Sequence, residues 1–122
     1  MRALIVDDSP TARAQARSAV EDAQARLGLT LEVEEAGNGM EALRALASEH
    51  IDILIVDLHM PDMTGLEVLA FWKTRKEKSR AIVVSTDVSP RDREKALEAG
   101  AFRFLEKPVT TDAMAEALAG LT

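Results

Sequence analysis

The chain has 122 residues, a length that suits a single domain with one hydrophobic core. Apolar residues make up 47% of the chain and charged residues 30%, which is typical of a folded globular protein and excludes a disordered one. The net charge of −6 argues against a general nucleic-acid-binding surface, and because the chain has no cysteine it offers neither disulfides nor thiolate metal sites.

Strand-like and helix-like stretches alternate along the chain. In chain order, the apolar pattern predicts a strand at 3–6, a helix at 10–27, a strand at 31–35, a helix at 40–50, a strand at 51–56, a helix at 66–76, a strand at 81–85, a helix at 89–100, a strand at 102–105 and a helix at 110–119. Five strand–helix repeats favour a parallel sheet with helices on both faces. Because no repeat, low-complexity tract or linker interrupts them, we expect one domain over residues 1–122.

Several helix ends carry residues that favour initiation or termination. Ser9 is a candidate N-cap with Pro10 in the first helical position, and Gly28 can end the same helix. Ser89 and Gly100 can begin and end a later helix in the same way. Helical spacing predicts an apolar face on two other helices, formed by Met40, Leu43 and Leu46 and by Met114 and Leu118.

The composition of the strands predicts their order in the sheet. Strands that are buried on both faces are continuous apolar runs, whereas edge strands can carry interleaved charges. Residues 3–6, 53–56 and 81–84 are continuous runs, and residues 31–35 and 102–105 carry charges. We therefore expect a doubly wound five-stranded α/β sheet in the order 2-1-3-4-5, with its binding crevice at the carboxyl ends of strands 1 and 3.

Polar residues lie at the carboxyl ends of four of these strands. They are Asp7 and Asp8 after the first strand, Asp57 after the third, Ser85 and Thr86 at the end of the fourth, and Lys107 and Pro108 after the fifth. Singly, each has an ordinary explanation as a turn, capping or loop residue. Together, three acids, a hydroxyl and a lysine at one edge of the sheet favour a functional site.

Three clustered carboxylates need a cation. Two carboxylates about 4 Å apart repel by roughly 4 kcal/mol at an effective dielectric constant of about 20. Mg²⁺ takes oxygen ligands and keeps waters for phosphate oxygens, and Lys107 can pair with Asp57. This combination favours phosphoryl transfer, in which a carboxylate oxygen attacks, the cations neutralise phosphate charge and the Ser85 hydroxyl donates to a phosphate oxygen.

Five segments carry a family resemblance over essentially the whole chain. They are IVDDSP (5–10), EAGNGMEAL (35–43), DILIVDLHMPDMTGLEVL (52–69), VVST (83–86) and EAGAFRFLEKP (98–108). In this order and at these spacings they resemble the receiver domain of two-component response regulators, of the chemotaxis-regulator-like type. The resemblance implies a flavodoxin-like (βα)5 fold and a signalling switch that receives a phosphoryl group from a sensor histidine kinase or phosphotransfer protein. Such a domain assists its own phosphotransfer and dephosphorylation but is not a turnover enzyme.

The resemblance also implies the acceptor and the metal ligands. Asp57 is expected to be the phosphoacceptor. Asp7, Asp8 and Asp57, with the backbone carbonyl of His59, are expected to hold Mg²⁺ or Mn²⁺.

Further residues are expected to respond to the phosphoryl group. Ser85 takes the place of the family's hydroxyl, selected over Thr86 by its spacing from residues 100–101, and Lys107 takes that of the family's lysine, which a cis-proline bond often follows. Phe104 falls at the aromatic position whose rotation accompanies activation. Ordinary core packing is the alternative for Phe104 and for Phe102.

Three residues beside the acceptor are expected to influence how long the phosphoryl group lasts. They are His59, Thr86 and Asp87. Thr86 stands where family members commonly carry a smaller residue, so its side chain can narrow access to Asp57. The alternative for His59 is an exposed loop residue that uses only its backbone.

The resemblance places the partner surface on the helix at 89–100, the strand at 102–105 and the helix at 110–119. A downstream protein target is expected there, although the charges of the first helix otherwise indicate a solvated face: Arg91, Arg93, Glu94, Lys95 and Glu98. Phe71 and Trp72 are expected in the core or half-buried. The apolar run 3–6 is too short for a signal peptide or membrane span, so we expect a cytoplasmic protein that does not enter a membrane. Because of the negative net charge, we also expect no direct binding of nucleic acid.

Three other functions were weighed against the residues. A metal-dependent phosphatase with a phosphoaspartate needs a second acid shortly after its nucleophile, but Leu58 and His59 follow Asp57. A flavin-binding protein of the same strand order needs hydroxyls and N–H groups after the first strand, where Asp7 and Asp8 would repel its phosphate. A receiver-like scaffold that has lost phosphorylation and works only by protein contacts stays open.

Overall fold

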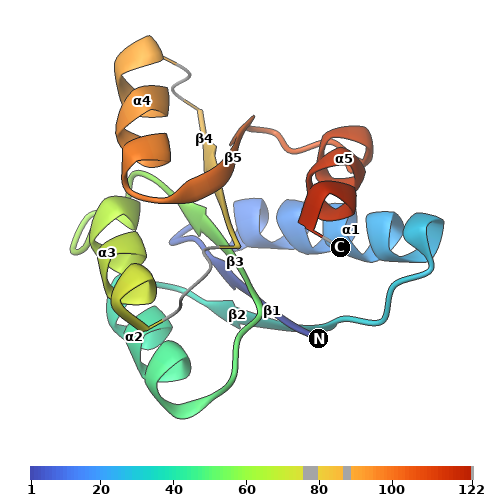
Figure 1. Ribbon diagram of the computed structural model, residues 1–122, viewed down its shortest axis with the longest axis horizontal. Helices are drawn as coiled ribbons and strands as arrows, with labels where there is room; N and C mark the ends of the chain where they lie inside the picture. Colours follow the sequence, from blue (N-terminus) through green and yellow to red (C-terminus); the bar gives the residue numbers. More distant parts are fainter. Residues whose placement is uncertain (76–79, 87–88, 122) are drawn as a thin grey trace.

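The computed structural model describes residues 1–75, 80–86 and 89–121. Strands and helices alternate in the order β1 (Arg2–Val6), α1 (Pro10–Leu27), β2 (Glu32–Ala36), α2 (Gly39–Ser48), β3 (Ile53–Asp57), α3 (Gly65–Arg75), β4 (Ala81–Ser85), α4 (Pro90–Glu98), β5 (Ala101–Glu106) and α5 (Thr111–Leu121) (Figure 1). These boundaries lie within two residues of the predicted ones. Lys76, predicted at the end of a helix, lies outside the described residues.

The sheet has the predicted order, β2-β1-β3-β4-β5, and all its neighbouring strands are parallel. Every residue of β3 and β4 is buried, whereas β5 has only Ala101 and Phe104 buried and β2 is mostly exposed or half-buried. The continuous apolar runs therefore form the centre of the sheet, because only central strands are covered on both faces.

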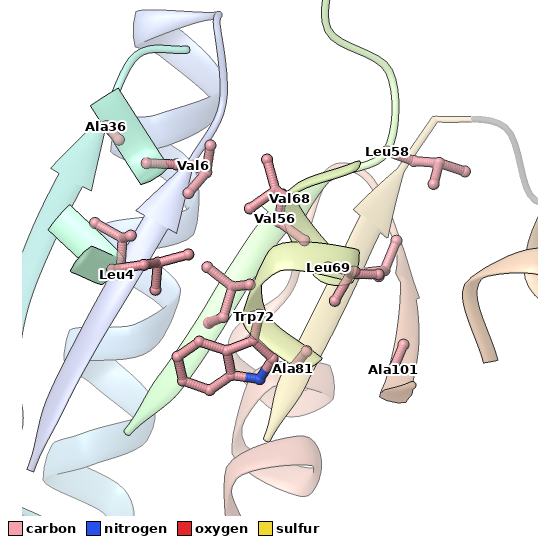
Figure 2. Close-up of a cluster of buried hydrophobic side chains, with 14 of the residues drawn as sticks. Leu4, Val6, Ala36, Val56, Leu58, Val68, Leu69, Trp72, Ala81 and Ala101 are labelled. Carbon is pink, nitrogen blue, oxygen red and sulfur yellow. The ribbon is translucent and has the colours of Figure 1, made fainter. Parts of the chain in front are cut away.

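Helices cover both faces of the sheet. Figure 1 shows α1 and α5 on one side and α2, α3 and α4 on the other. Successive side chains of a strand point to opposite faces, so Leu4 and Val6 pack in the core under α2 and α3, while Ala3 and Ile5 pack under α1 and α5. Figure 2 shows the first of these cores, in which Trp72 of α3 lies with Leu4 on the same face of the sheet. As predicted, Trp72 is buried, and Phe71 is half-buried.

The predicted helix caps are present. The hydroxyl of Ser9 accepts a hydrogen bond from the Ala12 amide at 3.2 Å, and Ser89 caps α4 in the same way. Gly28 and Gly100 adopt positive φ angles of 68° and 106° directly after α1 and near the end of α4.

The apolar face that helical spacing predicts is buried in α5 but only partly buried in α2. Met114 and Leu118 of α5 are fully buried. In α2, Leu46 is buried and Leu43 half-buried, but Met40 is 53% exposed. Met40 lies in the first turn of α2, where Gly39 and Ala42 occupy the buried positions instead.

Candidate functional site

Strand register places the three acids at one edge of the sheet. Val6 of β1 pairs with Val56 of β3, so Asp7 and Asp57 emerge side by side at the carboxyl ends of these central strands. One carboxylate oxygen from each of Asp7, Asp8 and Asp57 lies within 4.8 Å of the other two. Asp7 and Asp57 are buried, whereas Asp8 is exposed. The cluster is therefore open to solvent through Asp8.

Hydrogen bonds hold the amide, the carboxylate and the backbone carbonyl of Asp7. Its amide donates to the carbonyl of Ala36 at 3.2 Å, beyond the last paired residue of β1. Its Oδ1 accepts from the amide of Ser9 at 2.9 Å, and its backbone carbonyl accepts from the Arg13 guanidinium at 2.6 Å. The direction of the Asp7 carboxylate is thus fixed by the turn between β1 and α1.

Lys107 supplies a cation to two of the acids. Its Nζ lies 2.6 Å from Asp7 Oδ2 and 3.3 Å from Asp57 Oδ1. The Lys107 amide donates to the carbonyl of Ser85 at 2.8 Å, which ties the end of β5 to the end of β4. The bond between Lys107 and Pro108 is cis. The lysine therefore reaches Asp57, as the sequence predicted, and reaches Asp7 more closely.

The surroundings of Asp57 and Lys107 shift the pKa values of both side chains. Burial raises the pKa of this carboxyl, Lys107 opposes the rise and Asp7 adds to it, so the pKa stays above its usual range. For Lys107, burial lowers the pKa, but the hydrogen bond to Asp7 and the charge of Asp57 outweigh it and raise the pKa overall. One lysine does not offset the charge of three carboxylates.

The donor set fits a divalent metal ion. Three carboxylates whose oxygens lie within 4.8 Å of one another can act as ligands for hard cations such as Mg²⁺, Mn²⁺ and Ca²⁺. The exposed Asp8 leaves an open side for water or a phosphate oxygen. The acidic triad is thus consistent with a divalent metal site.

The loop after Asp57 passes close to the Asp57 carboxylate. The His59 amide donates to Asp57 Oδ1 at 3.4 Å, which places the loop backbone beside the carboxylate. A Cβ atom at Gly65 would overlap the backbone carbonyl oxygen of Asp57, so only glycine permits α3 to begin this close to β3. The role of the His59 carbonyl as a metal ligand stays a prediction.

The His59 side chain contacts helix α4. Its ring is 57% exposed, and Nε2 lies 3.2 Å from Asp92 Oδ2 in the first turn of α4. No sequence pattern predicts this contact, because residues 59 and 92 belong to different strand–helix units. His59 is therefore an exposed loop residue whose side chain also contacts α4.

Of the predicted response residues, Ser85 and Thr86 lie at the same end of the sheet as the acids, whereas Phe104 lies within β5, paired with Val83 of β4. Ser85 is fully buried at the end of β4, and Thr86 is exposed after it. Phe104 is buried, with the Arg93 guanidinium 5.4 Å from its ring centroid. Phe102 is half-buried on the opposite face of β5, under Arg103. Asp87 lies outside the described residues.

Sequence reasoning missed two residues that support the cluster. Arg13 of α1 bonds the Asp7 carbonyl, and its Nε lies 3.3 Å from Glu35 Oε1 of β2. The available signal was an arginine one turn after the N-cap Ser9, combined with an acid at the carboxyl end of an adjacent strand.

In the described parts of the chain, no helix is long and apolar enough to span a membrane.

The family is shown by sequence comparison. A profile of the response regulator receiver domain matches residues 3–119. Protein-glutamate methylesterase/protein-glutamine glutaminase 3 of Hahella chejuensis is 41% identical over 112 residues, which are 88% of this chain and 30% of that protein. Sensor protein EvgS of Escherichia coli is 34% identical over 113 residues, which are 91% of this chain and 9% of that protein. The chain thus spans less than a third of the length of either curated relative.

Solved structures show the same fold. Chemotaxis protein CheY4 of Vibrio cholerae superposes with a TM-score of 0.84 at 28% identity, covering 99% of this chain and 98% of that one. A response regulator of Burkholderia pseudomallei, whose structure holds a phosphorylated aspartic acid and a calcium ion, has a TM-score of 0.79 at 26% identity over 96% of this chain and 65% of that one. Fold, acidic pocket and sequence agree: this chain belongs to the response regulator receiver domains, which are phosphorylation-activated switches of two-component signalling and not turnover enzymes.

Proposed function

We propose that residues 1–122 act as one receiver domain that accepts a phosphoryl group on Asp57 from a sensor histidine kinase or phosphotransfer protein. The observation that carries this proposal is the setting of Asp57. It is buried at the end of the central strand β3, 3.3 Å from the Lys107 ammonium and beside the Asp7 and Asp8 carboxylates. The phosphorylated aspartic acid of the Burkholderia relative and the similarity to a sensor protein support the assignment.

The proposed transfer uses the Asp57 carboxylate as nucleophile. A carboxylate oxygen forms a bond to phosphorus while the bond to the donor's leaving group breaks, and the leaving group keeps the bonding electrons. The product is an acyl phosphate on Asp57. Lys107 offsets negative charge on the phosphoryl oxygens. Bound by Asp7, Asp8, Asp57 and the backbone carbonyl of His59, Mg²⁺ or Mn²⁺ would supply the remaining positive charge.

The signal is proposed to leave through helix α4. The new phosphoryl group offers hydrogen-bond acceptors to the Ser85 hydroxyl and to the Lys107 ammonium. Ser85 ends β4 and Lys107 follows β5. Both therefore lie next to the output face, which is the surface of α4, β5 and α5. Phe104 is the proposed switch residue of this face, and it already contacts α4 through Arg93. Leu97 of α4 is 48% exposed and offers apolar surface to a downstream protein.

Three residues are proposed to set the phosphoryl lifetime. His59 is two residues beyond Asp57, Thr86 follows Ser85, and Asp87 is two residues beyond Ser85. The contact between His59 and Asp92 supports this role for His59, because it ties the loop beside Asp57 to α4. Replacing each residue singly by the one common in the family and timing dephosphorylation tests the proposal; unchanged rates for all three would contradict it.

A small phosphodonor tests the main proposal. The wild-type protein, mixed with Mg²⁺ and acetyl phosphate, is expected to gain a single phosphoryl group by intact mass, and EDTA is expected to prevent the gain. Asp57→Asn should gain none. Asp62→Asn, which removes an exposed acid from the same loop, is the matched control and should gain one. No gain by the wild-type protein would instead indicate a receiver-like scaffold.

A further inference from the structure

Arg13 connects the metal-binding turn to the neighbouring strand. Its Nη1 donates to the backbone carbonyl of Asp7 at 2.6 Å, and its Nε lies 3.3 Å from a carboxylate oxygen of Glu35. The Arg13 side chain is 20% exposed, so the guanidinium is largely shielded from water. A hydrogen bond from a charged donor in such a setting is stronger than one between neutral groups.

The carbonyl that Arg13 holds belongs to the peptide bond between the two predicted metal ligands. On its other side, Asp7 is held by the bond from its amide to Ala36. The orientation of this peptide plane sets the direction in which the Asp8 side chain leaves the backbone. Asp8 is exposed, so packing does not fix it as it fixes Asp7. Arg13 therefore contacts the peptide group that orients Asp8, the less constrained of the two acids.

The position of Arg13 is itself fixed by neighbours. Glu35 pairs with Arg13 through one oxygen and with Arg17 through the other, at 2.8 Å, so both lobes of the carboxylate are engaged. A Cβ atom at Gly37 would lie only 3.2 Å from Arg13 Nη1, so the glycine leaves room for the guanidinium. Glu35 also balances the charge of Arg13, which limits repulsion between Arg13 and a bound cation.

We infer that Arg13 is a positioning residue for the metal site, which it serves by fixing the peptide bond between Asp7 and Asp8, with Glu35 holding Arg13 in place. This inference rests on the proposed function, because it assumes that these acids bind Mg²⁺. Residues that orient metal ligands through one hydrogen bond commonly change metal affinity by about 10–100-fold when removed. Arg13 does not contact the phosphoryl acceptor, so it is expected to act on affinity and not on the transfer step.

Calorimetric titration of the full chain with Mg²⁺ tests the inference. Arg13→Ala is expected to raise the Mg²⁺ dissociation constant about tenfold. The matched control is Arg26→Ala, which removes an arginine of the same helix from a 2.7 Å pair with Asp112, away from the site. It should change the constant by less than about twofold, because exposed pairs contribute little. Arg13→Lys, which keeps a charged donor but not the fork, should fall between Arg13→Ala and wild type.

Two further readouts separate positioning from a general structural role. At saturating Mg²⁺, Arg13→Ala should be phosphorylated by acetyl phosphate at the wild-type rate, whereas at limiting Mg²⁺ it should be slower. Adding Glu35→Gln to Arg13→Ala should weaken Mg²⁺ binding no further. If Arg13→Ala does not fold, Arg13→Lys and Glu35→Gln give the same comparison singly.

The outcomes distinguish this inference from the proposed function. If Arg13→Ala binds Mg²⁺ as tightly as Arg26→Ala, or more tightly, the positioning role is wrong while the phosphorylation of Asp57 is untouched. A wild-type protein that binds no Mg²⁺ and gains no phosphoryl group would overturn both.

Discussion

Lys107 is hydrogen-bonded to Asp7, with 2.6 Å between Nζ and Oδ2, and is 0.7 Å farther from Asp57, at 3.3 Å. The lysine that is expected to contact the phosphoryl group thus pairs first with a predicted metal ligand. A cation beside the acids offsets part of their mutual repulsion, so this ammonium should stabilise the metal-free fold and compete with a metal for Asp7.

Lys107→Met should therefore destabilise the metal-free protein and increase the effect of Mg²⁺. The loss of a charged hydrogen bond to buried Asp7 is expected to cost about 2 kcal/mol of unfolding free energy. Added Mg²⁺ should restore more stability in this variant than in wild type. Denaturant unfolding followed by the fluorescence of Trp72, which is buried, measures both effects. Lys95→Met, at an exposed site in α4, is the control; equal midpoints for the two metal-free variants would refute the prediction.

Asp57→Asn should stabilise the metal-free protein near neutral pH. Burial raises the pKa of the Asp57 carboxyl, so the stability that its protonated form contributes is present at acid pH and is lost as the pH rises through the raised pKa. An uncharged asparagine avoids this loss. The gain over wild type should thus shrink as the pH falls through the raised pKa and should be absent below the ordinary aspartate range. Mg²⁺ should raise the melting temperature of the variant less than that of wild type; a variant that melts below wild type at neutral pH without Mg²⁺ would count against this account.

Glu34→Gln should flatten the acid pH dependence of stability. A carboxyl–carboxyl hydrogen bond to Glu49, together with burial, raises the pKa of Glu34 in the edge strand β2. Its contribution to stability is present below the ordinary glutamate pKa and is lost as the pH rises through the raised one. The glutamine amide can donate to Glu49 at every pH, so the variant should be the more stable protein near neutrality.

Unfolding midpoints measured from acid to neutral pH test the Glu34 prediction. Glu32→Gln, which removes an acid from the same strand and from its pair with Arg2, is the matched control and should not gain stability. Parallel pH curves for wild type and Glu34→Gln would show that the pairing with Glu49 does not matter.

Asp92→Asn should shorten the phosphoryl lifetime on Asp57. The His59 amide lies 3.4 Å from Asp57 Oδ1 while its ring contacts Asp92 of α4, so this contact restrains the loop beside the Asp57 carboxylate. Releasing the ring should speed hydrolysis by about threefold, the equivalent of one hydrogen bond of about 0.7 kcal/mol. Timing dephosphorylation by intact mass measures the change.

A double variant tests whether Asp92 acts through His59. With His59→Asn already present, Asp92→Asn should add no further acceleration. Asp112→Asn, at an exposed acid in the first turn of α5, is the control. Additive effects of the two substitutions would show that Asp92 influences the lifetime by another route.

The sheet order could be predicted because burial acts on whole strands. Residues 53–56 and 81–84 are continuous apolar runs that are stable only with cover on both faces, while the charges within 31–35 are tolerated only at an edge. Once the order is known, the backbone brings Asp7 and Asp57 to neighbouring strand ends without any knowledge of side-chain contacts. The sequence pattern was therefore sufficient to predict that the three acids and Lys107 lie close together.

Contacts between side chains of different units were not predictable in this way. Arg13 with Glu35 and His59 with Asp92 depend on how a helix is rotated against a strand end or loop, which a single sequence does not specify. The exposure of Met40 has a similar cause, because helical periodicity defines a face but not where that face passes the edge of the sheet. These residues modify a site whose location the backbone already determines.

Identifying the modified residue tests the central claim most directly. The protein is incubated with Mg²⁺ and acetyl phosphate, the acyl phosphate is reduced with borohydride, which converts a phosphorylated aspartate to homoserine, and the product is located by peptide mass spectrometry. We expect homoserine at position 57 and at no other aspartate, and none in the presence of EDTA. Homoserine at Asp7, Asp8 or Asp62, or its absence from a protein that binds Mg²⁺, would contradict the assignment of Asp57 as the phosphoacceptor.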